Sequence, residues 1–150
     1  NVDYTIFRFF NTYGPLQSDE FVITKFINQA LKNKNLIING DGKQTRTFLY
    51  IDDNIFLTTS AFINKKFIND VVNIGNDNET TIENLAKKIK KLLKSKSKII
   101  YGKALKDGDM KRRKPSLKKI NIIKKQKFVN LEKGIIETAK FLNNSKWVYR

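Results

Sequence analysis

Short runs of strand-forming residues alternate along this chain with amphipathic helical stretches, and this order constrains the fold more than any other feature. The run from Tyr4 to Phe10 is dense in aromatic and β-branched residues without strict alternation, which is typical of a strand buried on both faces in a parallel sheet. From Asp19 to Asn33 apolar residues recur at steps of three and four, which predicts a helix with one apolar stripe. The alternation indicates an α/β fold.

The rest of the chain continues this alternation within one domain. Further strands are predicted at 36–38, 45–51, 71–75 and 98–101, and further helices after Asp52 or Asp53, from Thr80 or Thr81 to Lys94, at 117–123 and at 131–143. The helix after residue 53 is expected to bury Ile55, Phe56, Thr59, Phe62 and Ile63. No internal repeat or low-complexity linker interrupts the 150 residues.

Side chains that can cap a helix precede most of these segments. The candidates are Ser18 or Asp19 for the first helix, with Glu20 in its first turn, Thr80 with Glu83 in a capping box, and Ser116 for the helix at 117–123. The pair Asp52 and Asp53 has two readings. It could be an acid/base couple, but aspartates at the start of a periodic run more often cap the helix.

The chain contains no cysteine and no histidine. Disulfides, thiolate chemistry and cysteine-based zinc sites are therefore excluded, and the commonest general base and metal ligand is missing. No apolar run approaches membrane-spanning length, and the first residues lack the pattern of a signal peptide. We therefore expect a soluble, cytoplasmic protein with no metal site and no membrane partner.

The formal net charge of +16 raises the alternative of a basic nucleic-acid-binding module. The segment from Lys87 to Lys127 would be its binding face. The excess charge is nearly all lysine, in a chain also rich in Asn and Ile, and compositional bias produces this pattern without a selected patch. Only five arginines are present, whereas readers of bases and phosphates usually rely on arginine. Nucleic acid is therefore the less favoured partner.

The stretch at 39–53 combines turn, strand and helix signals with an arginine. A Gly-Asp-Gly sequence at 40–42 supplies turn chemistry. In the strand that follows, Arg46, Phe48 and Tyr50 share one face, which puts a cation beside aromatic rings and suits an anionic, partly flat ligand. An amphipathic strand at a sheet edge is the alternative.

Polar residues also follow the first predicted strand. The sequence Asn11-Thr12-Tyr13-Gly14-Pro15 lies at its carboxyl end, where open α/β sheets carry ligand contacts, and a plain turn is the equal alternative. A self-contained nucleotide-binding domain would show a glycine-rich strand-to-helix turn near its start, and this chain has none. The chain therefore looks like the second half of a larger fold.

Four motifs in this order resemble the NAD-dependent nucleotide-sugar epimerase/dehydratase family of extended short-chain dehydrogenases. They are Arg8-Phe9-Phe10-Asn11-Thr12-Tyr13-Gly14-Pro15, Gly40-Asp41-Gly42-Lys43-Gln44-Thr45-Arg46-Thr47-Phe48, Val72-Asn73-Ile74-Gly75-Asn76 and Arg112-Arg113-Lys114-Pro115. The second and fourth look most like those of UDP-glucuronate decarboxylases. The resemblance implies the C-terminal portion of such an enzyme, with the last strands of a Rossmann-type parallel sheet at 1–15 and about 51–75, and a smaller substrate-binding α/β lobe at 16–50 and 76–150.

The resemblance also implies a binding site. Phe9 and Thr12 would lie against the nicotinamide of an NAD cofactor, and Arg46 and Arg113 would hold the diphosphate of a UDP- or dTDP-sugar from two sides. The implied substrate-binding residues are Asn11, Val22, Ile23, Lys25, Phe26, Ile37, Ile38, Asn39, Arg46 and Arg113. Two guanidiniums on one pyrophosphate make charge-assisted, often bidentate bonds, so the implied role agrees with the chemistry of these residues.

Two residues depart from the family pattern. Asn39 stands where many members carry an aromatic residue, which puts stacking on the base in doubt, and Ser116 replaces a common aspartate. The family's glycine-rich NAD turn and Tyr-x-x-x-Lys catalytic pair lie upstream of residue 1, so this stretch is expected to carry no catalytic residue. The implied reaction of the full-length protein, expected to be a homodimer, begins with transient oxidation of a sugar hydroxyl by NAD. A severed parallel sheet also predicts poor stability for this stretch alone.

Overall fold

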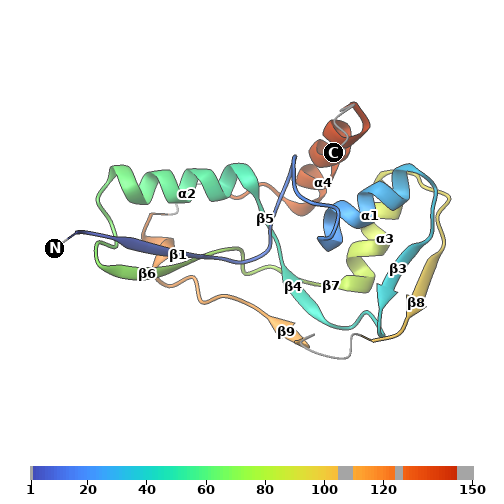
Figure 1. Cartoon of the computed structure of the whole chain (residues 1–150), viewed down its shortest axis with the longest axis horizontal. Coiled ribbons are helices and arrows are strands. Elements are labelled where there is room, and N and C mark those ends of the chain that lie inside the picture. Colours follow the sequence, from blue (N-terminus) through green and yellow to red (C-terminus); the bar gives the residue numbers. More distant parts are fainter. Residues whose placement is uncertain (1, 105–109, 124–126, 145–150) are drawn as a thin grey trace.

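The computed structural model describes residues 2–104, 110–123 and 127–144 of the chain. Its strands are β1 (Thr5–Phe9), β2 (Thr12–Tyr13), β3 (Leu36–Asn39), β4 (Thr45–Thr47), β5 (Leu49–Tyr50), β6 (Asp70–Ile74), β7 (Glu79–Thr81), β8 (Ile99–Gly102) and β9 (Arg112–Arg113). Its helices are α1 (Val22–Leu31), α2 (Ile51–Ile63), α3 (Ile82–Leu92), the 3-10 turn η1 (Ile120–Ile122) and α4 (Leu131–Asn144). Figure 1 shows an elongated molecule, with α2, β1 and β6 at one end, α1, α3, β3 and β8 at the other, and β4 between them.

Most strand pairs are parallel, which confirms the predicted α/β class. β1 pairs with β6, β2 with β5, and β3 with β8, all in parallel. The central sheet is mixed: β4 lies between β7, which is antiparallel to it, and β9, which is parallel. Parallel pairing joins segments far apart in the chain, so residues from both halves of the sequence meet at β4.

The core consists of two hydrophobic clusters that meet at the segment 48–50. Phe48 and Tyr50 belong to the cluster between α1, α3, β3 and α4, whereas Leu49 belongs to the cluster between α2, β6 and η1. Successive side chains of an extended segment point to opposite sides, so this short stretch joins both clusters. The strand predicted at 45–51 is accordingly interrupted at Phe48, and α2 begins at Ile51.

The predicted cap of the first helix was wrong. α1 begins at Val22, its N-cap Phe21 makes no side-chain capping bond, and no acidic residue lies in its first turn. Ser18 instead accepts a hydrogen bond of 3.3 Å from the Glu20 N–H in the turn before the helix. The capping candidates set the start too early, because the predicted apolar period itself begins at Val22, where the helix begins.

Neither aspartate of the pair at 52–53 caps α2 with its side chain. Tyr50 is the N-cap, without a side-chain bond. Asp53 is 2% exposed and accepts a hydrogen bond of 2.8 Å from the Val129 N–H, so its carboxylate joins α2 to the segment before α4. Asp52 is exposed. The two carboxylates therefore lie in different environments and do not form an acid/base couple.

The cap of α3 lies one residue later than predicted. Thr81 is the N-cap, and its hydroxyl accepts from the Asn84 N–H at 3.1 Å. Glu83 pairs with Lys87 rather than with Thr80, so the predicted capping box is absent. The pairing of β7 with β4 takes Thr80 into the sheet.

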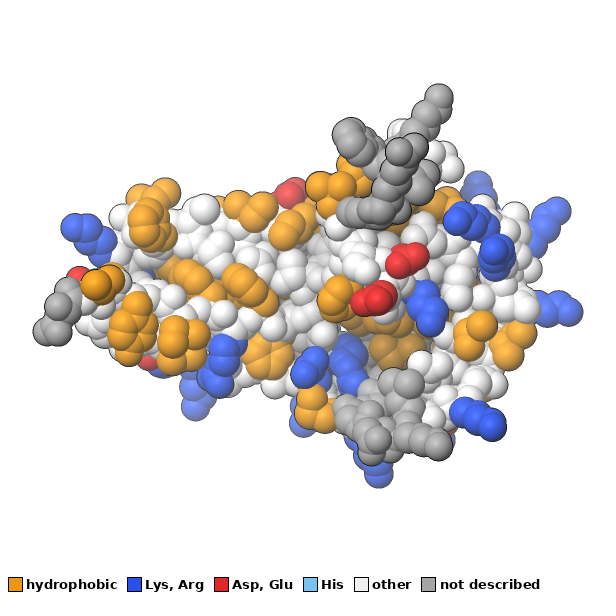
Figure 2. Space-filling view, in the orientation of Figure 1, with side chains coloured by type: hydrophobic (Ala, Val, Ile, Leu, Met, Phe, Trp, Pro, Cys, Tyr) orange, Lys and Arg blue, Asp and Glu red, His pale blue; other side chains and the backbone are white. Residues whose placement is uncertain are grey.

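The predicted burial of α2 was wrong for all of its residues but Phe56, which packs partly buried against the second cluster. The side chains of Ile55, Phe62 and Ile63 are 52%, 83% and 74% exposed, whereas the opposite face of the helix buries Leu57 and Ala61. β1 is likewise not buried on both faces, because Ile6 and Phe9 are exposed. Figure 2 shows hydrophobic side chains spread over the end of the molecule that carries α2 and β1. In the described residues no second layer covers this face.

The segment at 117–123 forms only the turn η1, although Leu117, Ile120 and Ile123 are buried as an apolar period requires. The segment is short, and a single turn is enough to bring these three side chains into the core, so no full helix forms. β9 at Arg112–Arg113 was not predicted. Across the described segments, no helix has the length and apolar character needed to cross a bilayer.

Candidate functional site

A hollow of about 200 Å³ opens beside the central sheet. Its walls come from the end of β1, from α1, from β3 and from β4. The lining residues are Asn11, Glu20, Val22, Lys25, Phe26, Ile37, Ile38, Asn39, Gln44, Arg46, Phe48 and Ile82. Four segments of the first half of the chain and the start of α3 therefore converge on one cavity.

Asn11 sits at the carboxyl end of β1 in a strained backbone conformation. Its φ is 41°, in the left-handed region that asparagine tolerates better than most residues. The side-chain amide donates to the Thr47 carbonyl at 2.9 Å, and the Asn11 carbonyl accepts from the Leu49 N–H at 3.2 Å. These bonds fix the carboxamide at the mouth of the hollow. Backbone strain of this kind concentrates at binding sites, where the surrounding structure holds it in place.

The deep wall of the hollow is apolar. Phe26 is 1% exposed and Ile38 is fully buried, so both are rigid parts of the core, while Ile37 on the same strand is 45% exposed. α1 carries Val22 and Phe26 at a spacing of four, which brings both to one face of the helix. The result is a flat apolar surface next to polar groups, as small-molecule sites commonly have.

Arg46 supplies the positive charge at the sheet side. Its Nη1 donates to the Thr45 carbonyl at 2.8 Å and to the Met110 carbonyl at 2.7 Å, which draws the guanidinium towards the segment that leads into β9. Arg46 is the register partner of Arg113 across the β4–β9 pair. Side chains of paired residues leave a sheet on the same face, so both arginines belong to one face of this sheet.

The polar rim of the hollow mixes charges and amides. Lys25 and Arg46 are cationic and Glu20 is anionic. Gln44 donates from Nε2 to the Asn39 carbonyl at 3.1 Å, which joins the Gly-rich turn to the end of β3. Two cations against one anion favour an anionic ligand.

The structure brings eight of the predicted substrate-binding residues into this hollow: Asn11, Val22, Lys25, Phe26, Ile37, Ile38, Asn39 and Arg46. It does not bring in Ile23, which is 1% exposed and packs in the core. Arg113 is not among the lining residues but lies beside Arg46 in the sheet and is exposed.

Phe48, which was predicted beside Arg46 on the face suited to an anionic, flat ligand, lines the hollow, whereas Tyr50 does not. Sequence reasoning missed Glu20, Gln44 and Ile82. A signal existed for Gln44, because it lies close to Arg46 within the motif that suggested the site. Glu20 and Ile82 carry no such signal. Their place at the hollow depends on how α1 and α3 pack.

Phe9 and Thr12, the residues predicted to lie against the nicotinamide, end β1 and begin β2, and neither lines the hollow. Phe9 is 57% exposed, and its ring stacks with that of Phe7 at a centroid distance of 6.5 Å. The Thr12 hydroxyl accepts from Asn54 Nδ2 at 2.7 Å, and the Thr12 carbonyl accepts from Gln17 Nε2 at 2.6 Å. The hydroxyl proton of Thr12 remains available to a ligand.

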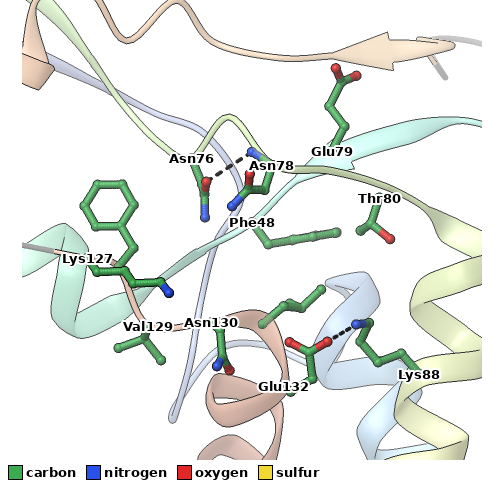
Figure 3. Close-up of a pocket in the computed structure, with 12 residues that line it drawn as sticks. Phe48, Asn76, Asn78, Glu79, Thr80, Lys88, Lys127, Val129, Asn130 and Glu132 are labelled. Atoms are coloured by element: carbon green, nitrogen blue, oxygen red, sulfur yellow. Dashed lines mark hydrogen bonds and ion pairs between the residues drawn. The ribbon is translucent and has the colours of Figure 1, made fainter.

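A second, larger hollow of about 370 Å³ lies on the other side of Phe48, whose ring lines both cavities. Figure 3 shows its polar side chains, many of which hold the surrounding loops. Asn76 Oδ1 accepts from the Asn78 N–H at 3.1 Å, Asn130 Oδ1 accepts from the Lys133 N–H at 2.8 Å, and Lys88 pairs with Glu132. These bonds account for much of the polarity of the second hollow, so the smaller one is the better candidate site.

The tyrosines with shifted acidity are poor bases. Burial and the nearby Tyr50 raise the pKa of Tyr13, and burial next to Asp52 raises that of Tyr50. The hydrogen bond to Glu83 raises the pKa of Tyr101. A tyrosinate base needs a lowered pKa, so these three side chains do not serve as one. Among the described residues, no cluster of acidic side chains could hold a metal ion.

The lysines of α3 do not form an open basic face as a whole. Lys87 pairs with Glu83 at 2.7 Å and Lys88 pairs with Glu132. Parts of the basic segment from Lys87 to Lys127, namely 105–109 and 124–126, lie outside the described residues. The nucleic-acid alternative gains no support from this geometry.

Comparison with known proteins identifies the fold. The profile of the NAD dependent epimerase/dehydratase family matches residues 1–75, half of the chain. UDP-N-acetyl-alpha-D-glucosaminuronate decarboxylase of Bacillus cytotoxicus is 36% identical over 146 residues, which cover 91% of this chain and 45% of that protein.

Two crystal structures show the same arrangement of elements. UDP-glucose 4-epimerase of Thermotoga maritima with UDP-glucose superposes with a TM-score of 0.87 at 28% identity, over 95% of this chain and 46% of that one. UDP-glucuronic acid 4-epimerase of Bacillus cereus with UDP-glucuronic acid and NAD superposes with a TM-score of 0.85 at 30% identity, over 93% and 45%. The chain spans about half the length of the curated relatives it matches. From the family profile, the relatives and the shared fold, the chain belongs to the NAD-dependent epimerase/dehydratase family.

Proposed function

We propose that this chain is the substrate-binding part of an NAD-dependent nucleotide-sugar epimerase, dehydratase or decarboxylase, and that it holds the diphosphate and base of a UDP- or dTDP-sugar. One observation carries the proposal. Arg46 and Asn11 line one hollow, and Arg113, the register partner of Arg46, stands beside it on the same face of the sheet.

The diphosphate is the part of the ligand that this arrangement suits best. Each guanidinium can bond two phosphate oxygens at once, and such charged hydrogen bonds contribute about 1.5–3 kcal/mol each. Arg46 is already oriented by two backbone carbonyls, so little of its side-chain freedom is lost on binding. Asn11, fixed by its bond to Thr47, adds an amide contact next to the phosphates.

The base would lie against the apolar wall formed by Val22, Phe26 and Ile37, with the end of β3 at its edge. Asn39 offers backbone and carboxamide groups there but no ring, so base recognition rests on hydrogen bonds at the base edge rather than on stacking. This arrangement favours a pyrimidine, which fits a hollow of about 200 Å³ more easily than a purine does.

Phe9 and Thr12 would hold the nicotinamide end of NAD at the carboxyl end of β1. When bound, NAD supplies the hydride acceptor for oxidation of a sugar hydroxyl. In this proposal, residues 1–15 and about 51–75 belong to the NAD-binding sheet, while 16–50 and 76–150 form most of the substrate lobe. The catalytic Tyr-Lys pair and the glycine-rich NAD turn belong to the remainder of the whole protein, which acts in the cytoplasm as a homodimer. The role of the present residues is to orient the substrate.

Thermal denaturation with UDP, dTDP, GDP and uridine tests the proposal. A ligand that binds only the folded state raises its stability by about 2.7 kcal/mol at one hundred times its Kd. We expect UDP and dTDP to raise the melting temperature more than GDP or uridine. A parallel salt titration with duplex DNA is the counter-test. Strongly salt-dependent DNA binding with no response to UDP would overturn the proposal.

A further inference from the structure

We propose that Glu79 is a positioning residue, which sets the spacing of Arg46 and Arg113 from the opposite face of the central sheet. The inference rests on the proposed function, because it assigns Glu79 a part in diphosphate binding without contact with the ligand. Glu79 lies on β7, which does not pair with β9, and yet its side chain reaches that strand.

The Glu79 carboxylate joins all three strands of the sheet. Its Oε1 accepts from the Thr45 hydroxyl on β4 and from Arg112 Nε on β9, both at 2.9 Å. Its Oε2 accepts from Arg112 Nη2 at 2.7 Å and lies 3.6 Å from Lys114 Nζ. The contact with Arg112 is thus a bidentate ion pair, the strongest geometry between these groups. Figure 3 shows Glu79 pointing away from the larger hollow and towards β9.

The two faces of the sheet have separate tasks. Register pairs Thr47 with Glu79 and Thr45 with Arg112, so these four residues share one face. Register also pairs Arg46 with Thr80 and with Arg113, which places these three on the other face. One face holds the strands together, and the other presents the two arginines.

β9 needs such a fastening because its own pairing is short. It contributes two residues to the sheet, and the Thr45 N–H adds a bond of 2.9 Å to the Lys111 carbonyl just before it. So short a ladder fixes register weakly. The Glu79–Arg112 pair adds a side-chain bond at the position next to Arg113, and it therefore sets where Arg113 stands relative to Arg46.

Charge compensation supports the same role. Four consecutive cationic residues run from Lys111 to Lys114, next to Arg46. Glu79 offsets two of them, Arg112 and Lys114, and these bonds hold the pKa of its carboxyl well below its usual range. Arg112 is engaged by Glu79, so Arg113 is the arginine of β9 that is left to a phosphate.

Isothermal titration of the 150-residue chain with UDP, UMP and uridine tests the inference. Glu79→Ala and Glu79→Gln are expected to weaken UDP binding by about tenfold, which corresponds to about 1.4 kcal/mol, and to leave uridine binding within about twofold. A merely structural defect would weaken all three ligands alike. Glu137→Gln is the matched control, because Glu137 also pairs with a lysine, at 3.0 Å, but on the exposed face of α4.

A double-substitution cycle makes the test specific. In an Arg113→Ala background, Glu79→Gln is expected to have almost no further effect on UDP affinity, because the group that it positions is gone. Additive losses, an unchanged affinity of Glu79→Gln for UDP, or equal losses for uridine would each overturn the inference. If the unaltered chain and Glu137→Gln both fail to bind UDP, the proposed function itself fails. If Arg113→Ala weakens UDP binding while Glu79→Gln does not, only this inference fails. Glu79→Gln keeps the shape of the side chain, so the cycle remains readable if Glu79→Ala does not fold.

Discussion

Arg46 and Arg113 are register partners on neighbouring strands, β4 and β9, although a long stretch of sequence separates them. Two guanidiniums side by side repel each other unless an anion lies between them. The Arg46 guanidinium is tied to the Met110 carbonyl and so cannot move far from β9. Arg46 lines the hollow and Arg113 stands beside it in the sheet, so a doubly charged ligand bound there would interact favourably with both charges.

Replacing either arginine tests this relationship. We expect Arg46→Ala and Arg113→Ala each to weaken UDP binding by about 1.5–3 kcal/mol, or roughly ten- to one-hundred-fold, because each removes charged hydrogen bonds to phosphate. Lysine at either position should restore only part of the affinity, since an ammonium cannot bond two oxygens in the same plane. Titration calorimetry with UDP and with uridine separates the phosphate contribution from that of the nucleoside.

The control for the arginine variants is Lys65→Ala, which removes an exposed cation in the loop after α2. Its UDP affinity should equal that of the unaltered chain. Equal losses for all three variants would mean that net charge alone governs binding, and the pairing of Arg46 with Arg113 would then have no special role.

Asn11 allows backbone strain to be separated from ligand contact. Asn11→Gly keeps the positive φ without strain, whereas Asn11→Ala keeps a Cβ in the left-handed region and loses the polar side chain that makes this region tolerable, at a cost of about 1–2 kcal/mol relative to glycine. Both lose the bond to the Thr47 carbonyl. We therefore expect both variants to bind UDP less well, and the alanine variant to be the less stable in urea denaturation. If the alanine variant were the more stable, the strain at Asn11 would not be real.

Acid should weaken the stabilisation that comes from the Glu79–Arg112 ion pair. The folded chain lowers the pKa of Glu79 to about 2 from an ordinary value of 4.5, first through its hydrogen bond from Arg112. The folded state thus releases this proton more readily than the unfolded state does. The stabilisation is fully present above the ordinary value and is lost as the pH falls towards the folded value. In urea denaturation at a series of pH values, the stability difference between the unaltered chain and Glu79→Gln should shrink over this window. A constant difference would contradict the assigned role of the ion pair.

The sequence predicted the elements whose signals are local. α3 follows from the period of Ile82, Leu85, Ala86 and Ile89, all buried as expected, and α4 follows in the same way. The sequence did not predict β2, β7 and β9, because each has only two or three residues and is stabilised mainly by pairing with another strand. The exposure of Phe62 was not predicted for a similar reason. Periodicity identifies an apolar face of a helix but does not show whether another layer covers that face.

For the site, prediction worked where the residues of a motif are adjacent in space as well as in sequence. Asn39 and Arg46 reach the same hollow because a tight turn joins their strands. Ile23 does not reach the hollow. It follows Val22 on α1, and one step along a helix turns the side chain by about 100°, which takes it into the core. The bond between Glu79 and Arg112 was invisible in the sequence, because neither residue lies in a pattern that points to the other.

Gly134 on α4 is packed against the two buried tyrosines. A Cβ at this position would lie 2.1 Å from the Tyr13 hydroxyl oxygen and 2.9 Å from the Tyr50 ring. We expect Gly134→Ala to destabilise the chain by about 1–3 kcal/mol through overpacking, despite the better helix propensity of alanine. Urea denaturation measures the loss. Tyr13→Phe removes the closest atom, so Gly134→Ala should cost less in that background, and an equal cost in both backgrounds would place the clash elsewhere.

The exposed apolar face of α2 leads to the last prediction. Phe62 and Ile63 are 83% and 74% exposed, so Phe62→Ser and Ile63→Ser should change the unfolding free energy of the isolated chain by less than about 0.5 kcal/mol. Leu57 on the opposite face is fully buried, and Leu57→Ala should cost about 2–5 kcal/mol. The serine variants should also bind less of a fluorescent hydrophobic dye and aggregate less, because they break up an uncovered apolar surface. A large loss of stability in Phe62→Ser would mean that the isolated chain covers this face in solution, and the poor independent stability expected from an open parallel sheet would then lose its physical basis.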